Sequence, residues 1–161
     1  MQPLAARLPF LVLPGNHEAA ANFSHFRQLW TMPSWEATEN LHWSLVLGPL
    51  RLLALNSEAF FWPESFGEAH MARLHSWLAG ELGRAALERH VVPWLLAAGH
   101  RPFYCSLPAA GGRCGEQYEA ARLGLPSRCP RDNPRACRRV PGAQSFPMEQ
   151  LLFKGGVDFA V

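Results

Sequence analysis

Several features that mark particular classes of protein are missing from this sequence. It contains no run of 18 or more apolar residues, so no segment is expected to span a membrane. Charged residues make up only 17% of the chain, and the net charge of +2 is too small to indicate a nucleic-acid or membrane partner. None of the four cysteines forms a Cys-x-x-Cys pair, which argues against a zinc knuckle.

The composition is otherwise that of an ordinary globular protein. Hydrophobic residues make up 48% of the 161 residues, which is enough for one domain with a core. The first residues are largely apolar, but Arg7 and Pro9 interrupt them and no small-residue cleavage site follows. We therefore do not interpret this stretch as a signal peptide.

The cysteines lie in two closely spaced pairs. Cys105 and Cys114 close one short loop, and Cys129 and Cys137 close another. Two local disulfides of about 2–3 kcal/mol each would fit this spacing, and free thiols are the alternative. Pairing is favoured for Cys105 with Cys114 and stays open for the second pair. A glycosylation sequon begins at Asn22 and, like disulfides, points to a secreted or extracellular protein.

Hydrophobic patterning predicts an α/β fold. Met71, Leu74 and Leu78 begin a run of apolar residues at helical spacing, which predicts an amphipathic helix ending between Gly83 and Arg89. The residues before Gly99 form a continuous apolar run, typical of a parallel strand buried on both faces. The predicted elements are a strand at 10–13, a helix at 22–30, a hairpin at 41–47 and 50–55, a helix at 67–89, a strand at 91–98, a helix at 146–153 and a strand from 157.

Residues 117–145 differ from the rest of the chain. They are rich in arginine and proline and show neither helical nor strand periodicity. We expect a disordered segment or a loop insertion here. A nucleic-acid-binding tract is the alternative, but no aromatic residues alternate with the arginines to stack on bases. No nucleic-acid partner is therefore predicted.

Polar residues follow two of the predicted strands. Asn16, His17 and Glu18 come after the first strand and Gly15, and His100 comes after the strand at 91–98. Ligands of α/β sheets gather at such strand ends. Amide oxygens and imidazole nitrogens ligate divalent metals, and an uncoordinated histidine can donate to a phosphate or a leaving group. A simple turn and a structural histidine would give the same pattern.

The other histidines are scattered along the chain and are interpreted as surface or packing residues: His25, His42, His70, His75 and His90.

The segments "LPGNHE" and "PWLLAAGHRPFYCS", in this order, resemble the purple acid phosphatases of the calcineurin-like metallophosphoesterase superfamily, especially the animal iron/zinc members. "NFSHFRQLWTMP", "HWSLVLGPLRLLALNSE" and "HSWLAGEL" resemble the same family. The similarity covers 9–106 and resumes at 146–161, whereas 117–145 departs from it.

The resemblance implies a fold, a reaction and roles for three residues. Residues 1–161 would be part of a metallophosphoesterase catalytic domain, an α/β domain whose β-sandwich is flanked by helices and is incomplete here. This family hydrolyses phosphate monoesters at a binuclear centre of iron with zinc or a second divalent ion. By the same resemblance, Asn16 and His100 are metal ligands and His17 is the catalytic histidine.

Other ligand blocks of that family are missing from the sequence. No Gly-Asp pair occurs, Tyr104 and Tyr118 stand in a different context, and no Gly-His-x-His block follows. Two neutral ligands are too few to hold a divalent ion well, because catalytic zinc sites use three protein ligands. We expect acid phosphatase activity in the complete protein and none from these residues alone. The alternative is a truncated, non-catalytic secreted glycoprotein.

Overall fold

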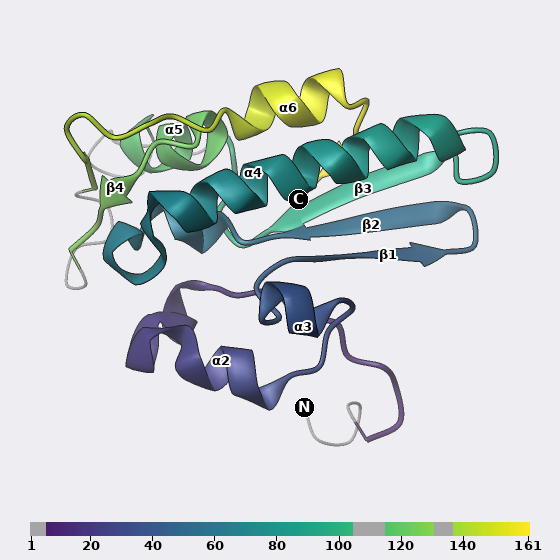
Figure 1. The fold of residues 1–161 in the computed structure, drawn as a ribbon, viewed down its shortest axis with the longest axis horizontal. Helices are drawn as coiled ribbons and strands as arrows, with labels where there is room; N and C mark the ends of the chain where they lie inside the picture. Colours follow the sequence, from purple (N-terminus) through teal and green to yellow (C-terminus); the bar gives the residue numbers. More distant parts are fainter. Residues whose placement is uncertain (1–5, 105–114, 131–136) are drawn as a thin grey trace.

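The computed structural model describes residues 6–104, 115–130 and 137–161. Its main sheet has four strands in the order β1-β2-β3-β6, and helices lie on both sides of it (Figure 1). The strands are β1 (Trp43–Leu47), β2 (Leu50–Leu55), β3 (Trp94–Gly99) and β6 (Phe159–Ala160). β1 is antiparallel to β2, whereas β2, β3 and β6 are parallel. The predicted α/β class is confirmed, and a mixed sheet between helices is consistent with part of a metallophosphoesterase fold.

The predicted hairpin is confirmed as β1 and β2. Its register runs from Trp43 opposite Ala54 to Leu47 opposite Leu50, and Gly48 makes the turn with a φ of +54°. Glycine adopts this left-handed conformation without the steric penalty of a Cβ atom. The turn therefore fixes which face of β2 is directed toward the core.

Helix α4 (Pro63–Glu88) covers one face of the sheet and confirms the predicted amphipathic helix. Its apolar face, which includes Met71, Leu74 and Leu78, is fully buried in a cluster with Leu53 of β2. Burial of one such side chain stabilises the fold by roughly 1.5–3 kcal/mol. The helix starts before the predicted 67 and continues across a kink at Gly67, where φ is +71°.

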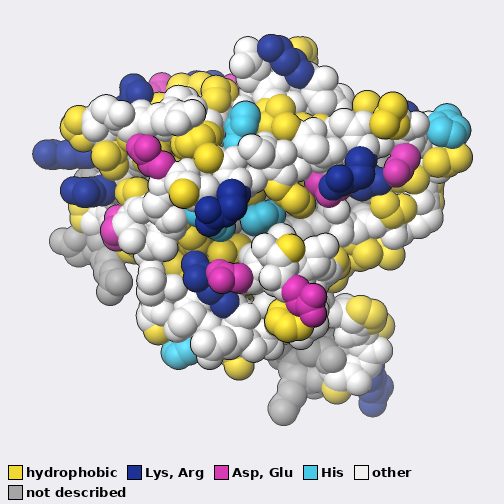
Figure 2. Space-filling model, viewed as in Figure 1, with side chains coloured by type: hydrophobic (Ala, Val, Ile, Leu, Met, Phe, Trp, Pro, Cys, Tyr) yellow, Lys and Arg dark blue, Asp and Glu magenta, His cyan; other side chains and the backbone are white. Residues whose placement is uncertain are grey.

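Smaller helices complete the two layers. α5 (Gly115–Leu123) and α6 (Met148–Lys154) lie on the same side of the sheet as α4, and α6 confirms the helix predicted at 146–153. α2 (Ser24–Leu29) and α3 (Trp35–Thr38) lie on the other side. None of the described helices is long and apolar enough to cross a membrane. On the face drawn in Figure 2, acidic and basic side chains are interspersed.

Strand β3 is not buried on both faces as predicted. Leu95 and Ala97 pack against the helix layer, but Trp94, on the opposite face, is 54% exposed. Phe159 of β6 lies beside Leu96 on that same open face and is 62% exposed. The alternation of side chains puts only one face of β3 into the core.

The strand predicted at 10–13 was wrong. These residues have no regular secondary structure, and none of the described strands pairs with them. The Trp43 indole Nε1 instead donates to the Val12 carbonyl at 2.8 Å, and the Val12 N–H contacts the Met32 sulfur at 3.3 Å. A side-chain donor and a packing cluster, rather than a strand ladder, fix this segment.

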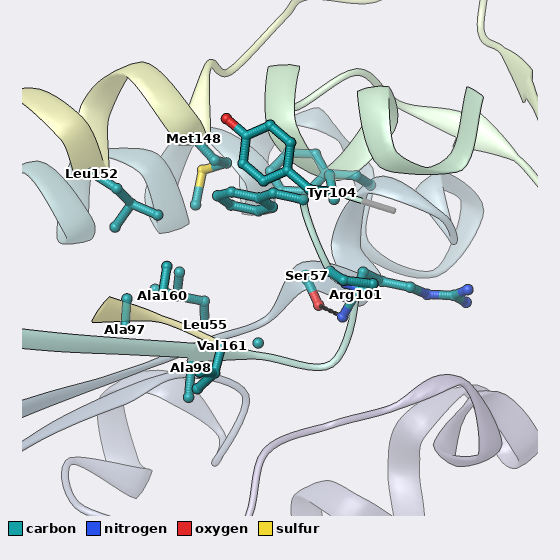
Figure 3. A pocket seen from close by; sticks show the side chains of 15 residues that line it. Leu55, Ser57, Ala97, Ala98, Arg101, Tyr104, Met148, Leu152, Ala160 and Val161 are labelled. Carbon is teal, nitrogen blue, oxygen red and sulfur yellow. Dashed lines mark hydrogen bonds between the residues drawn. The ribbon is translucent and has the colours of Figure 1, made fainter. Parts of the chain in front are cut away.

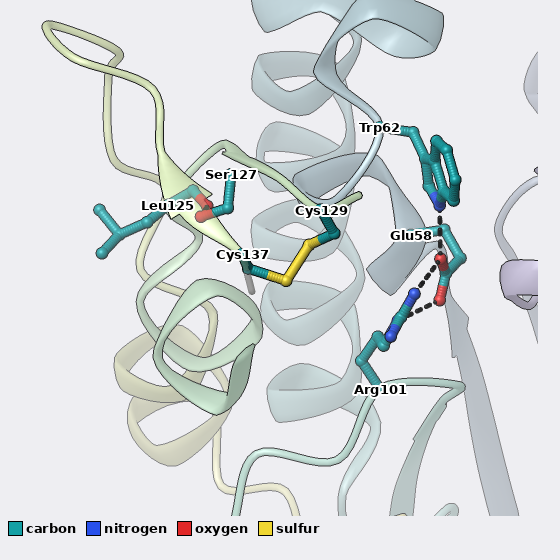
Figure 4. Close-up of a disulfide and its surroundings, with 7 residues drawn as sticks. All are labelled: Glu58, Trp62, Arg101, Leu125, Ser127, Cys129 and Cys137. Atoms are coloured by element: carbon teal, nitrogen blue, oxygen red, sulfur yellow. Dashed lines mark hydrogen bonds and ion pairs between the residues drawn. A yellow bond between two sulfur atoms is a disulfide. The ribbon is translucent and has the colours of Figure 1, made fainter. Parts of the chain in front are cut away.

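The segment 117–145, predicted to be a disordered segment or a loop insertion, contains regular elements in the part of it that the structure describes. It contains most of α5 and a two-stranded sheet of β4 (Ser127–Arg128) and β5 (Arg138–Arg139). A disulfide joins Cys129 to Cys137, with their Cα atoms 4.1 Å apart (Figure 4). This settles the question left open for that pair. The predicted pair Cys105 and Cys114 lies outside the described residues.

His70 of α4 and His42, just before β1, are buried together. Their ring centroids are 6.0 Å apart, and His70 Nε2 lies 3.3 Å from Asn56 Nδ2. Burial lowers the pKa of each histidine to about 4; the Arg73 charge is a smaller cause for His42, and the His42 and Arg73 charges are smaller causes for His70. These two residues confirm the packing interpretation, whereas His25 and His90 are exposed.

We predict that this buried pair makes the fold acid-sensitive. In the unfolded chain both histidines become protonated as the pH falls below 6.5, their ordinary pKa. In the folded protein they stay neutral until about pH 4. The free energy of unfolding should therefore fall between pH 6.5 and 4, by roughly 1.4 kcal/mol per pH unit for each histidine. Urea unfolding across this range measures it. His42→Gln should flatten the slope and His90→Gln should not; equal slopes would contradict the prediction.

A buried ion pair connects β2 to α4. Arg51 pairs with Glu81 at 3.0 Å and also with Glu88, and the side chains of Arg51 and Glu81 are only 8% and 5% exposed. Removing one partner of a buried pair leaves an uncompensated charge.

We predict that Glu81→Ala lowers the free energy of unfolding by about 3 kcal/mol, because Arg51 then keeps only the half-exposed Glu88. The matched control is Arg84→Ala, which removes the exposed partner of the same carboxylate and should cost less than about 1 kcal/mol. Urea midpoints give both values. Equal losses in the two variants would show that burial of the pair is unimportant.

Candidate functional site

The candidate site lies at the carboxyl ends of β2 and β3. Leu55 is opposite Gly99 at the last position of their parallel register, so the residues after the two strands leave the sheet side by side. Residues 56–58 follow β2 and residues 100–101 follow β3. The segment η1 (Asn16–Phe23) reaches the same place from the opposite face of the sheet.

Asn16 and His100 meet at this edge. His100 Nε2 lies 3.1 Å from Asn16 Oδ1, although the two residues are 84 positions apart in the sequence. The structure therefore brings together the two predicted metal ligands. Their role as ligands stays a prediction.

Gly15 allows this close approach. A Cβ atom at this position would lie 3.0 Å from His100 Nδ1 and 3.2 Å from Glu18 Oε2, which is tighter than most real contacts. The Glu18 carboxylate accepts the Gly15 N–H at 2.9 Å. Glu18 thus closes the turn that presents Asn16.

His17, the predicted catalytic residue, is exposed beside this pair. No hydrogen bond or ion pair to another described residue holds its imidazole. The side chain is therefore accessible to a ligand, and its catalytic role stays a prediction.

Glu58 is the central residue of the site, and the sequence analysis missed it. Its side chain is fully buried and accepts two hydrogen bonds from Arg101, at 2.6 Å from Nε and 3.0 Å from Nη2 (Figure 4). The Trp62 indole donates to the same carboxylate at 2.9 Å. Glu58 Oε1 also lies 4.0 Å from His100 Nε2. The sequence signal that could have indicated Glu58 is its place among polar residues directly after a buried strand, where ligands of α/β sheets gather.

Arg101 is fully engaged by its neighbours. Its guanidinium stacks over the Phe61 ring at 4.3 Å and its side chain is only 12% exposed. Its backbone N–H donates to Ser57 Oγ at 2.9 Å. Because Glu58 compensates its charge, Arg101 serves to hold the strand ends together and is not free to bind an anion.

A cavity of about 230 Å³ lies next to the site on the helix side of the sheet (Figure 3). Its walls are mostly apolar and include Phe60, Phe103 and Met148, with Ser57 at its edge. The guanidinium of Arg101 is directed away from it. Neither Asn16 nor His100 lines this cavity, so it adjoins the candidate site without forming its centre.

The described residues do not by themselves fit a binuclear metal centre. Among them, no group of three or more His, Cys, Asp or Glu side chains is placed to hold a metal ion. Asn16 and His100 are two neutral donors, and the oxygens of Glu58 already accept hydrogen bonds from Arg101 and Trp62. At least one further donor would be needed for a catalytic zinc site.

Comparison with known proteins identifies the family of this chain. No sequence model of a protein family matches the chain. Acid phosphatase type 7 of Homo sapiens is 32% identical over 158 residues, which cover 98% of this chain and 32% of that protein. The Danio rerio protein of the same name is 37% identical over 160 residues, with the same coverage. Probable purple acid phosphatase 20 of Arabidopsis thaliana is 30% identical over 121 residues, covering 70% of this chain and 26% of that protein.

The chain thus spans about a third of the length of the acid phosphatases type 7 that it matches. The similarity extends over nearly all of its residues and includes those at the carboxyl ends of β2 and β3. The chain belongs to a purple acid phosphatase-like family.

Proposed function

We propose that the complete protein is an acid phosphatase that hydrolyses phosphate monoesters, and that these residues supply one corner of its site. The observation that carries the proposal is the contact between Asn16 Oδ1 and His100 Nε2, which joins the two motifs of the predicted site. Relatives named acid phosphatases support the same reaction class.

The three predicted site residues have different roles in this proposal. Purple acid phosphatases generally depend on a binuclear metal centre, and we propose iron with zinc or another divalent ion for the complete protein. Asn16 and His100 would contribute two of its donors, with the others coming from elsewhere in that protein. His17 is exposed next to them and would donate a hydrogen bond to a phosphate oxygen or a proton to the leaving group.

We further propose that the complete protein is secreted and glycosylated. The Cys129–Cys137 disulfide supports an oxidising compartment, since structural disulfides are rare in the cytosol. Asn22, which begins the sequon, is exposed and accessible to a glycan. The competing function is a non-catalytic secreted glycoprotein, and the incomplete donor set of the described residues favours it for the 161-residue chain.

Activity assays separate these functions. The longest natural form of the protein should hydrolyse 4-nitrophenyl phosphate at mildly acidic pH, and His17→Ala should reduce kcat by about 10²–10⁴-fold, the range for loss of a general acid. Asn22→Gln, an exposed substitution in the same segment, should leave kcat unchanged. A longest form without activity, or a His17→Ala variant with normal kcat, would contradict the enzyme proposal.

Metal analysis tests whether the 161-residue chain holds only part of the metal donors. The purified 161-residue chain should retain well below one metal ion per molecule, because two neutral donors hold a divalent ion weakly. The longest form should retain about two, and Asn16→Ala in that form should lower the content. Two ions per molecule in the 161-residue chain would overturn the claim that its donor set is partial.

A further inference from the structure

Glu58 is the residue through which three parts of the site are joined. It lies in η2 (Ser57–Phe60), directly after β2, and it is 0% exposed. Arg101 binds it from the segment after β3, and Trp62 binds it from the start of α4. A buried carboxylate persists only when such partners compensate its charge.

The bond to Arg101 restrains His100 because the two residues are adjacent in the chain. A bidentate contact between a carboxylate and a guanidinium fixes orientation as well as distance. Stacking on Phe61 and the backbone bond to Ser57 remove the remaining freedom of Arg101. The peptide that carries His100 is therefore held at a fixed place relative to β2.

Glu58 also acts on the imidazole itself. His100 Nε2 lies 3.1 Å from Asn16 Oδ1, and these are the two atoms that would act as donors in the proposed site. Glu58 Oε1 lies 4.0 Å from the same ring nitrogen. The buried carboxylate therefore restrains the ring orientation in which His100 meets Asn16.

We propose that Glu58 is a positioning residue of the phosphatase site, which orients His100 toward Asn16 through Arg101 and through its own close approach to the His100 ring. The proposal rests on the proposed function, because it gives Glu58 a part in that reaction without contact to the substrate. A residue that only stabilised the fold would leave the His100 imidazole unchanged when its substitution is tolerated.

The first test uses the 161-residue chain and needs no activity. A ¹H–¹⁵N NMR spectrum of the imidazoles reports on the His100 ring, and His100→Gln identifies the His100 signals by their loss. The native chain should show a nuclear Overhauser contact between the His100 ring and the Asn16 side-chain amide. Glu58→Gln, which keeps the shape and removes the charge, should shift the His100 signals and weaken this contact. The matched control is Glu81→Gln, another buried glutamate paired with an arginine, which should leave them unchanged.

The second test uses the longest natural form. Glu58→Gln should lower kcat by about 10–100-fold with KM changed less than twofold, as expected for a residue that supports a site residue without touching substrate. Glu81→Gln should keep kcat within twofold. Arg101→Lys keeps the charge and loses the bidentate contact, so it should lower kcat by less than Glu58→Gln and also move the His100 signals.

The outcomes separate the two claims. An inactive longest form refutes the proposed function, while the His100 spectrum still tests the positioning role. If Glu58→Gln folds and leaves the His100 signals and kcat at the native values, the positioning role is refuted. Should Glu58→Gln not fold, native His100 signals and kcat in Arg101→Lys refute it equally.

Discussion

The parallel ladder between β2 and β3 is the constraint on which the candidate site depends. Its register places Leu55 opposite Gly99, so the chain leaves both strands at the same edge of the sheet. Burial of Leu53 and Leu95 against the helix layer holds that register, because a slip of either strand by one residue would turn its buried side chains to the opposite face. The contacts of Glu58 with Arg101 and of His100 with Asn16 are consequences of this pairing, since they join residues 43 and 84 positions apart in the sequence.

Charge compensation determines which side chains at the ends of β2 and β3 are available to a ligand. Glu58 and Arg101 neutralise each other in a buried setting, so neither is available to a ligand. Asn16 and His17 come from the other side of the sheet, on a turn closed by Glu18. Glu58 and Arg101 thus form a buried, charge-balanced pair. Asn16 and His17 are the more accessible side chains, and they would contact a phosphate ester. Sites built in this way hold their reactive groups in place through residues that never touch the substrate.

The sequence predicted the elements whose patterns are long or have a clear turn. The helical repeat of α4 and the Gly48-Pro49 turn both belong to this class. Proximity of residues 16 and 100 also followed from the rule that ligands gather at strand ends, even though residues 10–13 proved not to be a strand. A strand needs a partner, which local pattern does not reveal, and α5 was missed because it buries the small Ala120 and Ala121 instead of large apolar residues. Glu58 was missed because its role depends on an arginine 43 positions away.

Asn16 and His100 meet at the end of β3, and the proposed site depends on this contact. The most direct measurement is a nuclear Overhauser spectrum of the 161-residue chain with labelled side-chain amides and imidazoles. We expect a cross-peak between the Asn16 side-chain amide protons and the His100 ring protons, because Asn16 Oδ1 and His100 Nε2 lie 3.1 Å apart. A folded chain in which both side chains are assigned and no such cross-peak occurs would contradict it.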